Sequence, residues 1–297
     1  MDRYLVTGGA GFLGRYMVRR LRNKYVTVAL DNIEPDCGGD PSFPHTHVDV
    51  TDFNKLEEAI LQNGITHIIH LAAIARNLTS QADPVRAWEV NVTGTRNVLE
   101  IARRHKHPAL IKRVVCCSSN IVLSPEVTVY KGTKLADEAL VEMYSSLGVS
   151  CLALRPTNIY GAGQSGTEYQ PCAFRAMNDA YEQSGHFNIT GDGTQERDWI
   201  HADDVARAFE IASHSQVSGK SFDVSTGRLT TMNAIAQMLD VPVTNIPARP
   251  GDAKTVTSNP QKTKEVLGFE SRIRLEDGIM DAFPALRLHE SHTDIEA

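Results

Sequence analysis

Cysteine is scarce in this 297-residue chain, with five residues in all and no Cys-x-x-Cys pair. An odd number without such a pair argues against a disulfide framework and against a zinc site in a chain of this size. Cys116 and Cys117 fall within an apolar run and are predicted to pack inside a strand. His67 and His70 are three apart on a predicted strand and point to opposite faces, so we expect no shared metal.

The sequence also lacks an excess of positive charge and a long apolar run. Its formal net charge is −6, which offers no basic field to nucleic acid or to an acidic membrane surface. No apolar stretch approaches the length of a membrane span, and the sequence opens directly in a strand pattern without a charged and then apolar leader. We therefore expect a cytoplasmic protein without nucleic-acid or membrane partners.

What the sequence does contain is a glycine-rich turn near its start. Residues 4–7 predict a buried strand, and residues 15–21 continue at helical spacing after the turn. Glycine lets a phosphate approach the main chain, and the first N–H groups of a helix attract a pyrophosphate. The spacing Gly8-x-x-Gly11-x-x-Gly14 is one residue longer than the GxGxxG fingerprint. The turn therefore predicts a nucleotide site by its context, with a pure packing role as the alternative.

An acidic residue ends the next predicted strand. Asp31 follows the apolar residues 26–30 and lies about twenty residues beyond the turn, where an acid meets an adenosine ribose. A carboxylate there accepts hydrogen bonds from both ribose hydroxyls and repels a 2′-phosphate, which favours NAD over NADP. Asp49 and Val50 end a third extended piece, where they either contact an adenine ring or cap the strand.

Strands and helices alternate as far as residue 155 and predict a doubly wound parallel (Rossmann) sheet of the α/β class. Residues 66–73 form an apolar strand whose small final residues leave room for a nicotinamide. A helix is expected over 84–104. The strand at 114–119 places Ser118 and Ser119 at the carboxyl edge of the sheet, where ligands bind.

Beyond Arg155 the alternation loosens. We expect an NAD-binding Rossmann domain over 1–155 and a smaller C-terminal substrate-binding lobe over 156–289. Segments near 200–228 are expected to pack back on the first domain, with Asp203 capping a helix there. Residues 290–297 form a polar tail.

Tyr130 and Lys134 carry the chemistry that this sequence predicts. Four residues apart at the start of a helix, they lie on one face. An ammonium near a phenol favours the phenolate and lowers the tyrosine pKa from its usual ~10, so that the tyrosine can act as a base. Ser119 would hydrogen-bond and polarise the reacting oxygen. Taken alone, the Tyr–Lys pair is also compatible with an exposed helix pair.

Together these residues resemble the extended short-chain dehydrogenase/reductase family, specifically its NAD-dependent nucleotide-sugar epimerases and dehydratases of the UDP-glucose 4-epimerase type. The likeness covers nearly the whole chain. Its motifs are residues 7–14, 31–32, 70–73, 91–95, 118–119, 130–134, 154–156, 158, 160–161, 191–206 and 249–252.

This resemblance implies roles for particular residues. Tyr130 becomes the catalytic base, Lys134 its helper and Ser119 the oxygen partner. NAD contacts are implied for Gly8, Gly11, Phe12, Leu13, Gly14, Asp31, Asn32, Asp49, Val50, Leu71, Ala72, Ala73, Asn91, Tyr130 and Lys134. Asn158 and Arg197 are implied to touch the substrate diphosphate, for which a guanidinium is well shaped, and Arg249 and Asp252 the nucleotide end. A homodimer through the helices at 84–104 and 133–147 is expected on the same ground.

The likeness also separates reactions. The 4,6-dehydratases follow the serine position with an Asp-Glu pair, and the decarboxylases usually carry a glutamate nearby, whereas Ser119 is followed by Asn120 and Ile121. A nucleotide-sugar 4-epimerase is therefore the first choice. In that reaction Tyr130 removes the sugar C4 hydroxyl proton while NAD takes the C4 hydride, which later returns to the other face of the sugar.

One departure from the family keeps alternatives open. Ser119 and Tyr130 are 11 residues apart, whereas family members usually have a longer loop with a Tyr-Gly where this chain has Leu123-Ser124. A wall of the sugar pocket could be missing, so the substrate could differ. The alternatives are a sugar-nucleotide oxidoreductase or dehydratase with net redox or elimination, and a dinucleotide-binding regulatory protein without catalysis.

Overall fold

The computed structural model describes residues 1–32, 45–105, 110–164, 172–248, 255–284 and 286. Its centre is a seven-stranded sheet in the order β10-β6-β5-β4-β1-β2-β3, with every neighbouring pair parallel. The strands are β1 Arg3–Thr7, β2 Val26–Asp31, β3 His45–His47, β4 His67–His70, β5 Arg113–Cys117, β6 Cys151–Pro156 and β10 Ser221–Val224. This confirms the predicted doubly wound fold, in which the strand order reverses between β1 and β4.

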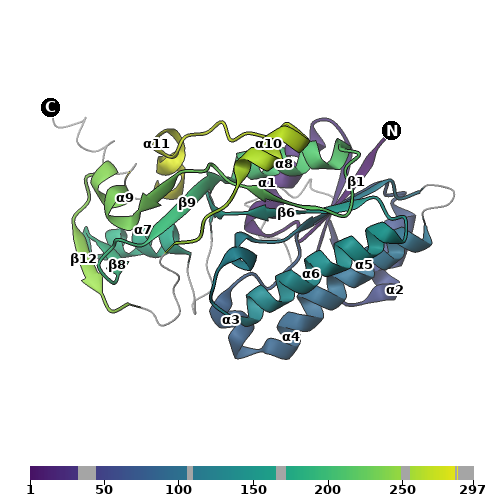
Figure 1. Cartoon of the computed structure of the whole chain (residues 1–297), viewed down its shortest axis with the longest axis horizontal. Coiled ribbons are helices and arrows are strands. Elements are labelled where there is room, and N and C mark those ends of the chain that lie inside the picture. Colours follow the sequence, from purple (N-terminus) through teal and green to yellow (C-terminus); the bar gives the residue numbers. More distant parts are fainter. Residues whose placement is uncertain (33–44, 106–109, 165–171, 249–254, 285, 287–297) are drawn as a thin grey trace.

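Helices cover both faces of this sheet (Figure 1). Helices α1 (Phe12–Arg22) and α8 (Ala202–His214) pack on one face; α2 (Phe53–Gln62), α5 (Gly94–Arg104) and α6 (Val129–Ser146) pack on the other. Successive residues of β1 point to opposite faces of the sheet. Tyr4 and Val6 pack in the core beneath α1 and α8, whereas Leu5 packs in the core beneath α2, α5 and α6. The strands are buried on both sides, as their nearly continuous apolar runs predict.

Two smaller sheets lie beside the large one, with orders β11-β9-β7 and β12-β8. Their strands are β7 Asn158–Tyr160, β8 Phe187–Thr190, β9 Glu196–His201, β11 Leu229–Thr231 and β12 Val243–Ile246. A separate aromatic cluster holds them together, in which Phe174 stacks on Trp199 with ring centroids 4.1 Å apart. The associated helices are α7 Ala173–Ser184, α9 Met232–Met238, α11 Leu275–Gly278 and the 3₁₀-helix Ile279–Ala282.

The chain returns to the large sheet after β9. Helix α8 packs against α1, and β10 pairs with β6, while α10 (Pro260–Leu267) lies against β10. The expected return of residues near 200–228 thus has a concrete form, although the proposed division at residue 155 stays a prediction. The expected polar tail at 290–297 lies outside the described residues.

Some local expectations need correction. The helix expected over 84–104 consists of α4 (Pro84–Trp88), a five-residue π-helix (Glu89–Thr93) and α5. His201, not Asp203, is the N-cap of α8: β9 ends directly at the helix, so His201 keeps an extended backbone and its ring accepts a hydrogen bond from the Asp203 N–H at 3.2 Å. Helix α3 (Asn77–Ala82) has no counterpart in the sequence prediction.

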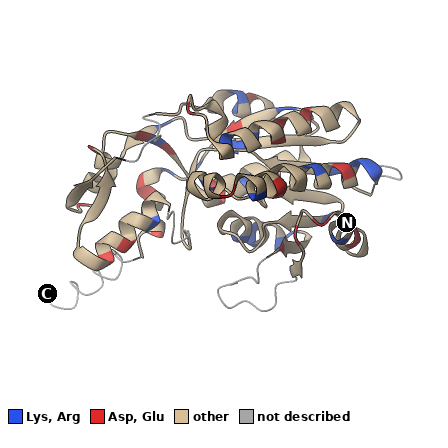
Figure 2. Ribbon diagram, turned by 90° about the horizontal axis from the view of Figure 1, so that it is seen from below, with Lys and Arg blue, Asp and Glu red and all other residues tan. Residues whose placement is uncertain are grey.

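Surface charge and metal ligands add little to the site search. Basic and acidic residues alternate along the helices in Figure 2. Within the described ranges no cluster of three or more His, Cys, Asp and Glu side chains is arranged to hold a metal ion. No helix in these ranges has both the length and the apolar character needed to cross a membrane.

Candidate active site

A pocket of about 890 Å³ opens at the carboxyl edge of the seven-stranded sheet and continues between this sheet and the smaller ones. That volume is at the large end of the range for small-molecule sites. Most of the predicted site residues line it: Gly8, Gly11, Phe12, Leu13, Gly14, Asp31, Asn32, Asp49, Val50, Leu71, Ala72, Ala73, Ser119, Tyr130, Asn158 and Arg197. Asn91 and Lys134 lie behind the pocket wall, and Arg249 and Asp252 fall outside the described residues.

The glycine turn joins β1 to α1 and forms one end of the pocket. Gly8 has φ +69°, and the Gly11 N–H donates to the Gly8 carbonyl at 3.1 Å. A Cβ on Gly14 would lie 2.0 Å from that same carbonyl oxygen, so a side chain cannot be accommodated there. The N-cap of α1 is Gly11 without a side-chain cap, and no acidic side chain lies in the first turn. The turn therefore leaves helix N–H groups to an anion from the pocket.

Two carboxylates stand beside this turn. Asp31, at the end of β2, accepts from the Ala10 N–H at 3.1 Å and from the Asn32 N–H at 2.9 Å. Asp49 pairs with Arg86 at 2.5 Å. Burial acts to raise the pKa of Asp49, but hydrogen bonds from Thr51 and Arg86 outweigh it and hold the pKa at about 2. The sequence indicated both acids; it gave no signal for Arg86, which comes from a distant helix.

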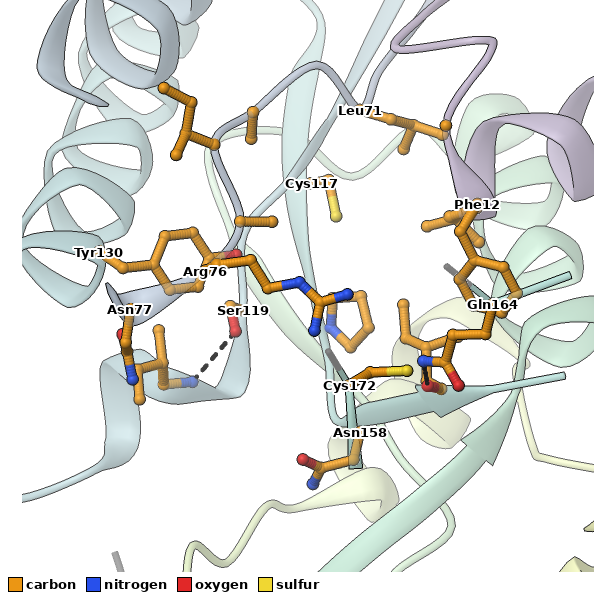
Figure 3. Close-up of a pocket in the computed structure, with 18 of the residues that line it drawn as sticks. Phe12, Leu71, Arg76, Asn77, Cys117, Ser119, Tyr130, Asn158, Gln164 and Cys172 are labelled. Carbon is orange, nitrogen blue, oxygen red and sulfur yellow. Dashed lines mark hydrogen bonds between the residues drawn. The ribbon is translucent and has the colours of Figure 1, made fainter. Parts of the chain in front are cut away.

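Ser119 and Tyr130 face the pocket from the far end of β5 and the start of α6 (Figure 3). Ser119 is the N-cap of a short 3₁₀-helix (Asn120–Leu123), and its Oγ accepts from the Ile121 N–H at 3.3 Å. Thr128 caps α6 in the same way and thereby fixes the start of the helix that carries Tyr130. The short segment between Ser119 and Tyr130 contains these two caps and the 3₁₀-helix.

Lys134 lies beneath Tyr130, with its Nζ 5.9 Å from the tyrosine ring centroid. The ammonium donates to the Cys117 carbonyl and to Asp137 Oδ2, each at 2.9 Å. Burial disfavours the charged lysine, but Asp137 more than compensates and raises its pKa. Asp137 was not among the residues predicted from the sequence, although a carboxylate three residues after a lysine on one helix can form an ion pair with it.

The pKa of Tyr130 differs from the sequence expectation. Burial raises it above the usual value, and the opposing effects of the Lys134 charge and a hydrogen bond with Ser119 are smaller. The predicted lowering by Lys134 is present as a contribution and does not dominate. With both partners in place, the pKa of the Tyr130 phenol still lies above its usual value.

Asn91 supports the site from behind. Its Oδ1 accepts from the Ile74 N–H at 2.7 Å, and its Nδ2 donates to the Ile74 carbonyl and to Thr133 Oγ1. Thr133 Oγ1 in turn donates to the Tyr130 carbonyl at 2.8 Å. Asn91 is fully buried in the π-helix. It ties the pocket wall at Ile74 to α6, and the NAD contact that the resemblance implied for it stays a prediction.

A second buried chain of hydrogen bonds joins β1, β4 and α5. His70 lies between Thr7 Oγ1, 2.7 Å from Nδ1, and Thr95 Oγ1, 3.1 Å from Nε2. Thr95 gives its own proton to the Asn91 carbonyl, so Nε2 of His70 must be the protonated nitrogen. Thr7 Oγ1 also accepts from the Leu71 and Ala72 N–H groups. The pocket wall after β4 therefore depends on a neutral histidine.

The far end of the pocket is formed by the small sheets. Asn158 on β7 donates to the Asp198 carbonyl at 3.2 Å, and Arg197 on β9 donates to the Glu196 carbonyl at 2.8 Å. Both side chains line the pocket, and their contact with a substrate diphosphate stays a prediction.

The pocket residues that were not predicted as site residues include Arg76, Asn77, Cys117, Gln164 and Cys172. They come from loops and element ends, where no periodic pattern marks a residue as inward-facing.

The sequence profile of the NAD dependent epimerase/dehydratase family matches residues 4–225. The chain belongs to this family. The match spans the glycine turn, the Ser119–Tyr130–Lys134 group and the return of the chain to β10, and it confirms the predicted family.

Known relatives are similar over their full length. UDP-glucose 4-epimerase of Rhizobium leguminosarum bv. trifolii is 28% identical, with 95% of this chain and 96% of the relative aligned. The structure of UDP-glucose 4-epimerase from Thermotoga maritima, solved with UDP-glucose, has a TM-score of 0.86 at 26% identity and covers 97% of this chain and 99% of its own. MoeE5, solved with UDP-glucuronic acid and NAD, has a TM-score of 0.82 at 27% identity over 97% of this chain and 100% of its own.

Proposed function

We propose that this protein is an NAD-dependent nucleotide-sugar 4-epimerase. The observation that carries the proposal is that Ser119 and Tyr130 line the same continuous pocket as the glycine turn, with Lys134 held directly behind Tyr130. Family membership supports NAD as the cofactor. The similarity to UDP-glucose 4-epimerases supports the reaction type.

The residues at the glycine end fit NAD. Gly8 and Gly14 let the turn pack closely against its own backbone and against Leu71 and Ala72. The uncapped N–H groups at the start of α1 would then hold the pyrophosphate. Asp31 would hold the adenosine ribose, and Leu71, Ala72 and Ala73 would form the nicotinamide wall. When bound, NAD supplies a reversible hydride acceptor for sugar C4.

The chain's own groups perform the proton chemistry. The Ser119 hydroxyl holds the sugar C4 oxygen. The Tyr130 phenolate accepts the proton of the C4 hydroxyl and later returns it to the C4 oxygen. Lys134 stays protonated because Asp137 raises its pKa, and its positive charge stabilises the phenolate. Asn120 and Ile121 carry no acid or base, which favours epimerisation over elimination of water.

We also propose which part of the chain binds the cofactor and which part binds the substrate. Residues 1–155 would hold the cofactor, and residues 156–289 would hold the rest of the nucleotide sugar, with Asn158 and Arg197 on the diphosphate. Cytoplasmic location is also part of the proposal; in the described part of the chain Cys116, Cys117, Cys151 and Cys172 form no disulfide, which supports it. Cell fractionation tests the location.

The homodimer expected through the helices at 84–104 and 133–147 is part of the proposal, and exposed apolar side chains on α4, on α6 and on the adjoining α3 support it. These helices carry exposed apolar side chains, which is unusual for a surface that faces water alone. They are Leu78, Val85, Trp88, Leu135, Met143 and Leu147. On α6, Leu135 and Met143 are eight residues apart and lie on the same side of the helix, and Leu147 is the C-cap residue that follows.

The decisive test incubates the protein with NAD and with UDP-, GDP-, dTDP- or CDP-sugars, and uses NMR to detect inversion at C4. We expect one sugar pair to interconvert without net change at the NADH absorbance band. Tyr130→Phe should lower turnover by roughly 10²- to 10⁴-fold while retaining cofactor binding. Steady growth or loss of NADH absorbance would instead support the oxidoreductase alternative.

A further inference from the structure

Arg76 brings a guanidinium into the middle of the pocket. It is the N-cap residue of α3, between the wall after β4 and the helix that follows. In Figure 3 its side chain crosses the pocket from the side of Ser119 and Tyr130 towards Cys172 and Gln164. The charge of Arg76 acts on Cys172 across the pocket. Burial raises the pKa of the Cys172 thiol, and Arg76 partly offsets this rise.

The charges along the pocket are unevenly placed. Among the described lining residues the acids are Asp31 and Asp49, both beside the glycine turn, and Asp49 is paired with Arg86. Arg197 contributes from β9 at the other end. The described part of the pocket around Ser119 and Tyr130 therefore has a cation and no carboxylate in its lining.

The backbone that carries Arg76 is anchored on both sides. The Ser80 N–H donates to the Arg76 carbonyl at 2.9 Å, and Ile74 is fixed by Asn91. The neighbouring Asn77 accepts from Thr128 Oγ1, the cap of α6, at 3.2 Å. Because the same cap positions Tyr130, Arg76 and Tyr130 are held in a common frame. Such preorganisation favours recognition of a planar anion by the guanidinium fork.

We propose that Arg76 binds a carboxylate on the sugar and that the substrates are nucleoside diphosphate hexuronates. The inference rests on the proposed function, because it takes C4 as the carbon at Tyr130. A hexuronate carries its carboxylate on C5, next to C4, whereas the diphosphate is attached at C1 across the ring. Arg76, which lines the same pocket as Tyr130, is thus placed for the carboxylate, and Arg197 for the diphosphate.

The first experiment compares binding of UDP-glucuronate, UDP-glucose and UDP to the NAD-loaded Tyr130→Phe protein by calorimetry. That background holds the substrates without turnover. Arg76→Gln should weaken UDP-glucuronate binding by roughly 10- to 100-fold and leave UDP-glucose and UDP within about twofold. Arg76→Lys should restore part of the loss. Arg274→Gln, an exposed arginine paired with Asp277 far from Tyr130, is the matched control and should change none of the three.

Two outcomes would overturn the inference. Equal losses for all three ligands would place Arg76 on the diphosphate, and no loss for UDP-glucuronate would remove it from recognition. Turnover separates this inference from the proposed function: if no sugar is inverted at C4, yet UDP-glucuronate binding still depends on Arg76, the epimerase proposal fails and the carboxylate site stands. If UDP-glucose is the only sugar inverted at C4, the epimerase proposal stands and the carboxylate site fails.

Discussion

Lys134 and Asp137 form an ion pair that is almost completely removed from water. Their side chains are 4% and 2% exposed, and Nζ lies 2.9 Å from Oδ2. The pair keeps the lysine charged beneath Tyr130, but the second oxygen of Asp137 has no hydrogen-bond partner in the described residues. Since a buried ion pair contributes little net stability but is costly to break, its value here is positional.

Removing one member of this pair should therefore be worse than removing both. Asp137→Asn leaves an uncompensated buried ammonium and should lower the free energy of unfolding by about 3 to 5 kcal/mol. The double variant Lys134→Met, Asp137→Asn should be more stable than Asp137→Asn alone. Urea denaturation of the parent protein, the two single variants Lys134→Met and Asp137→Asn, and the double variant measures the coupling energy between the two residues. Losses of unfolding free energy that simply add in the double variant would contradict a coupled ion pair.

Protonation of His70 should oppose folding. Burial, with a smaller contribution from Lys134, lowers its pKa to about 3 from the model-peptide value of 6.5. A protonated ring would have to donate to Thr7 Oγ1, which already accepts from two backbone N–H groups. The unfolded chain therefore binds this proton more readily, and stability falls as the pH drops below 6.5, by roughly 1.4 kcal/mol per unit.

The test is the slope of stability against pH between 6.5 and 4. His70→Gln should be less stable at pH 7 and show a flatter slope in urea denaturation. His67, whose pKa burial lowers to about 4, is present in both proteins and sets a common background. Parallel curves for the two proteins would rule out His70 as the cause.

Among single residues, the sequence predicted those whose role depends on their residue type and on their spacing from a near neighbour in the chain. Ser119, Tyr130 and Lys134 were identified because a strand end and an i, i+4 pair bring them together. Arg76, Arg86 and Asp137 were missed, since their importance depends on which distant segment they face. The roles assigned to the site residues stay predictions until the variants are measured.

Among the elements, the turn between β1 and α1 allows a matched pair of glycine variants. Gly14→Ala places a Cβ 2.0 Å from the Gly8 carbonyl oxygen, so the turn must shift and cofactor binding should be lost or greatly weakened. At Gly132, inside α6, an added Cβ meets nothing within 4 Å. Gly132→Ala should stabilise the protein by about 0.5 to 1 kcal/mol through helix propensity.

Thermal unfolding with and without NAD measures both variants. The shift of the melting temperature caused by NAD should shrink for Gly14→Ala and persist for Gly132→Ala. An unchanged NAD shift in Gly14→Ala would mean that the turn does not hold the pyrophosphate.

Elements with strong periodicity were predicted well, and their interruptions were not. The apolar stripe from Pro84 to Arg104 indicated one helix, because a π-helical segment hardly changes which residues face inward. The short strands of the smaller sheets and helix α3 have too few residues to display a period. They are defined by the pocket and aromatic cluster that they surround.

For the whole molecule, the prediction concerns assembly. Trp88→Asp combined with Leu135→Asp should convert a dimer to a monomer, because each places a charge in the proposed apolar contact. Val266→Asp changes another exposed apolar residue, on α10, and should leave the mass unchanged. Light scattering after size-exclusion chromatography measures both. A monomeric parent protein would refute the proposed dimer.

The fold class was predictable at this scale because alternating strands and helices permit few arrangements. The family profile confirms the NAD-dependent enzyme class as well. The position of β10 could not be read from the sequence: nothing local in Ser221–Val224 states that its neighbour is Cys151–Pro156, some seventy residues earlier.

That placement of β10 sets an order of events during synthesis. A ribosome that has released residues 1–155 has delivered six of the seven parallel strands, and the outer edge of β6 is still unpaired. The strand that covers this edge emerges only after β7, β8, β9 and α8 have been made. The nascent chain thus carries an open sheet edge through the production of the small-sheet strands, and an open edge is a template for pairing with other chains. A chain stalled between residues 156 and 220 would keep the outer edge of β6 unpaired for as long as the stall lasts.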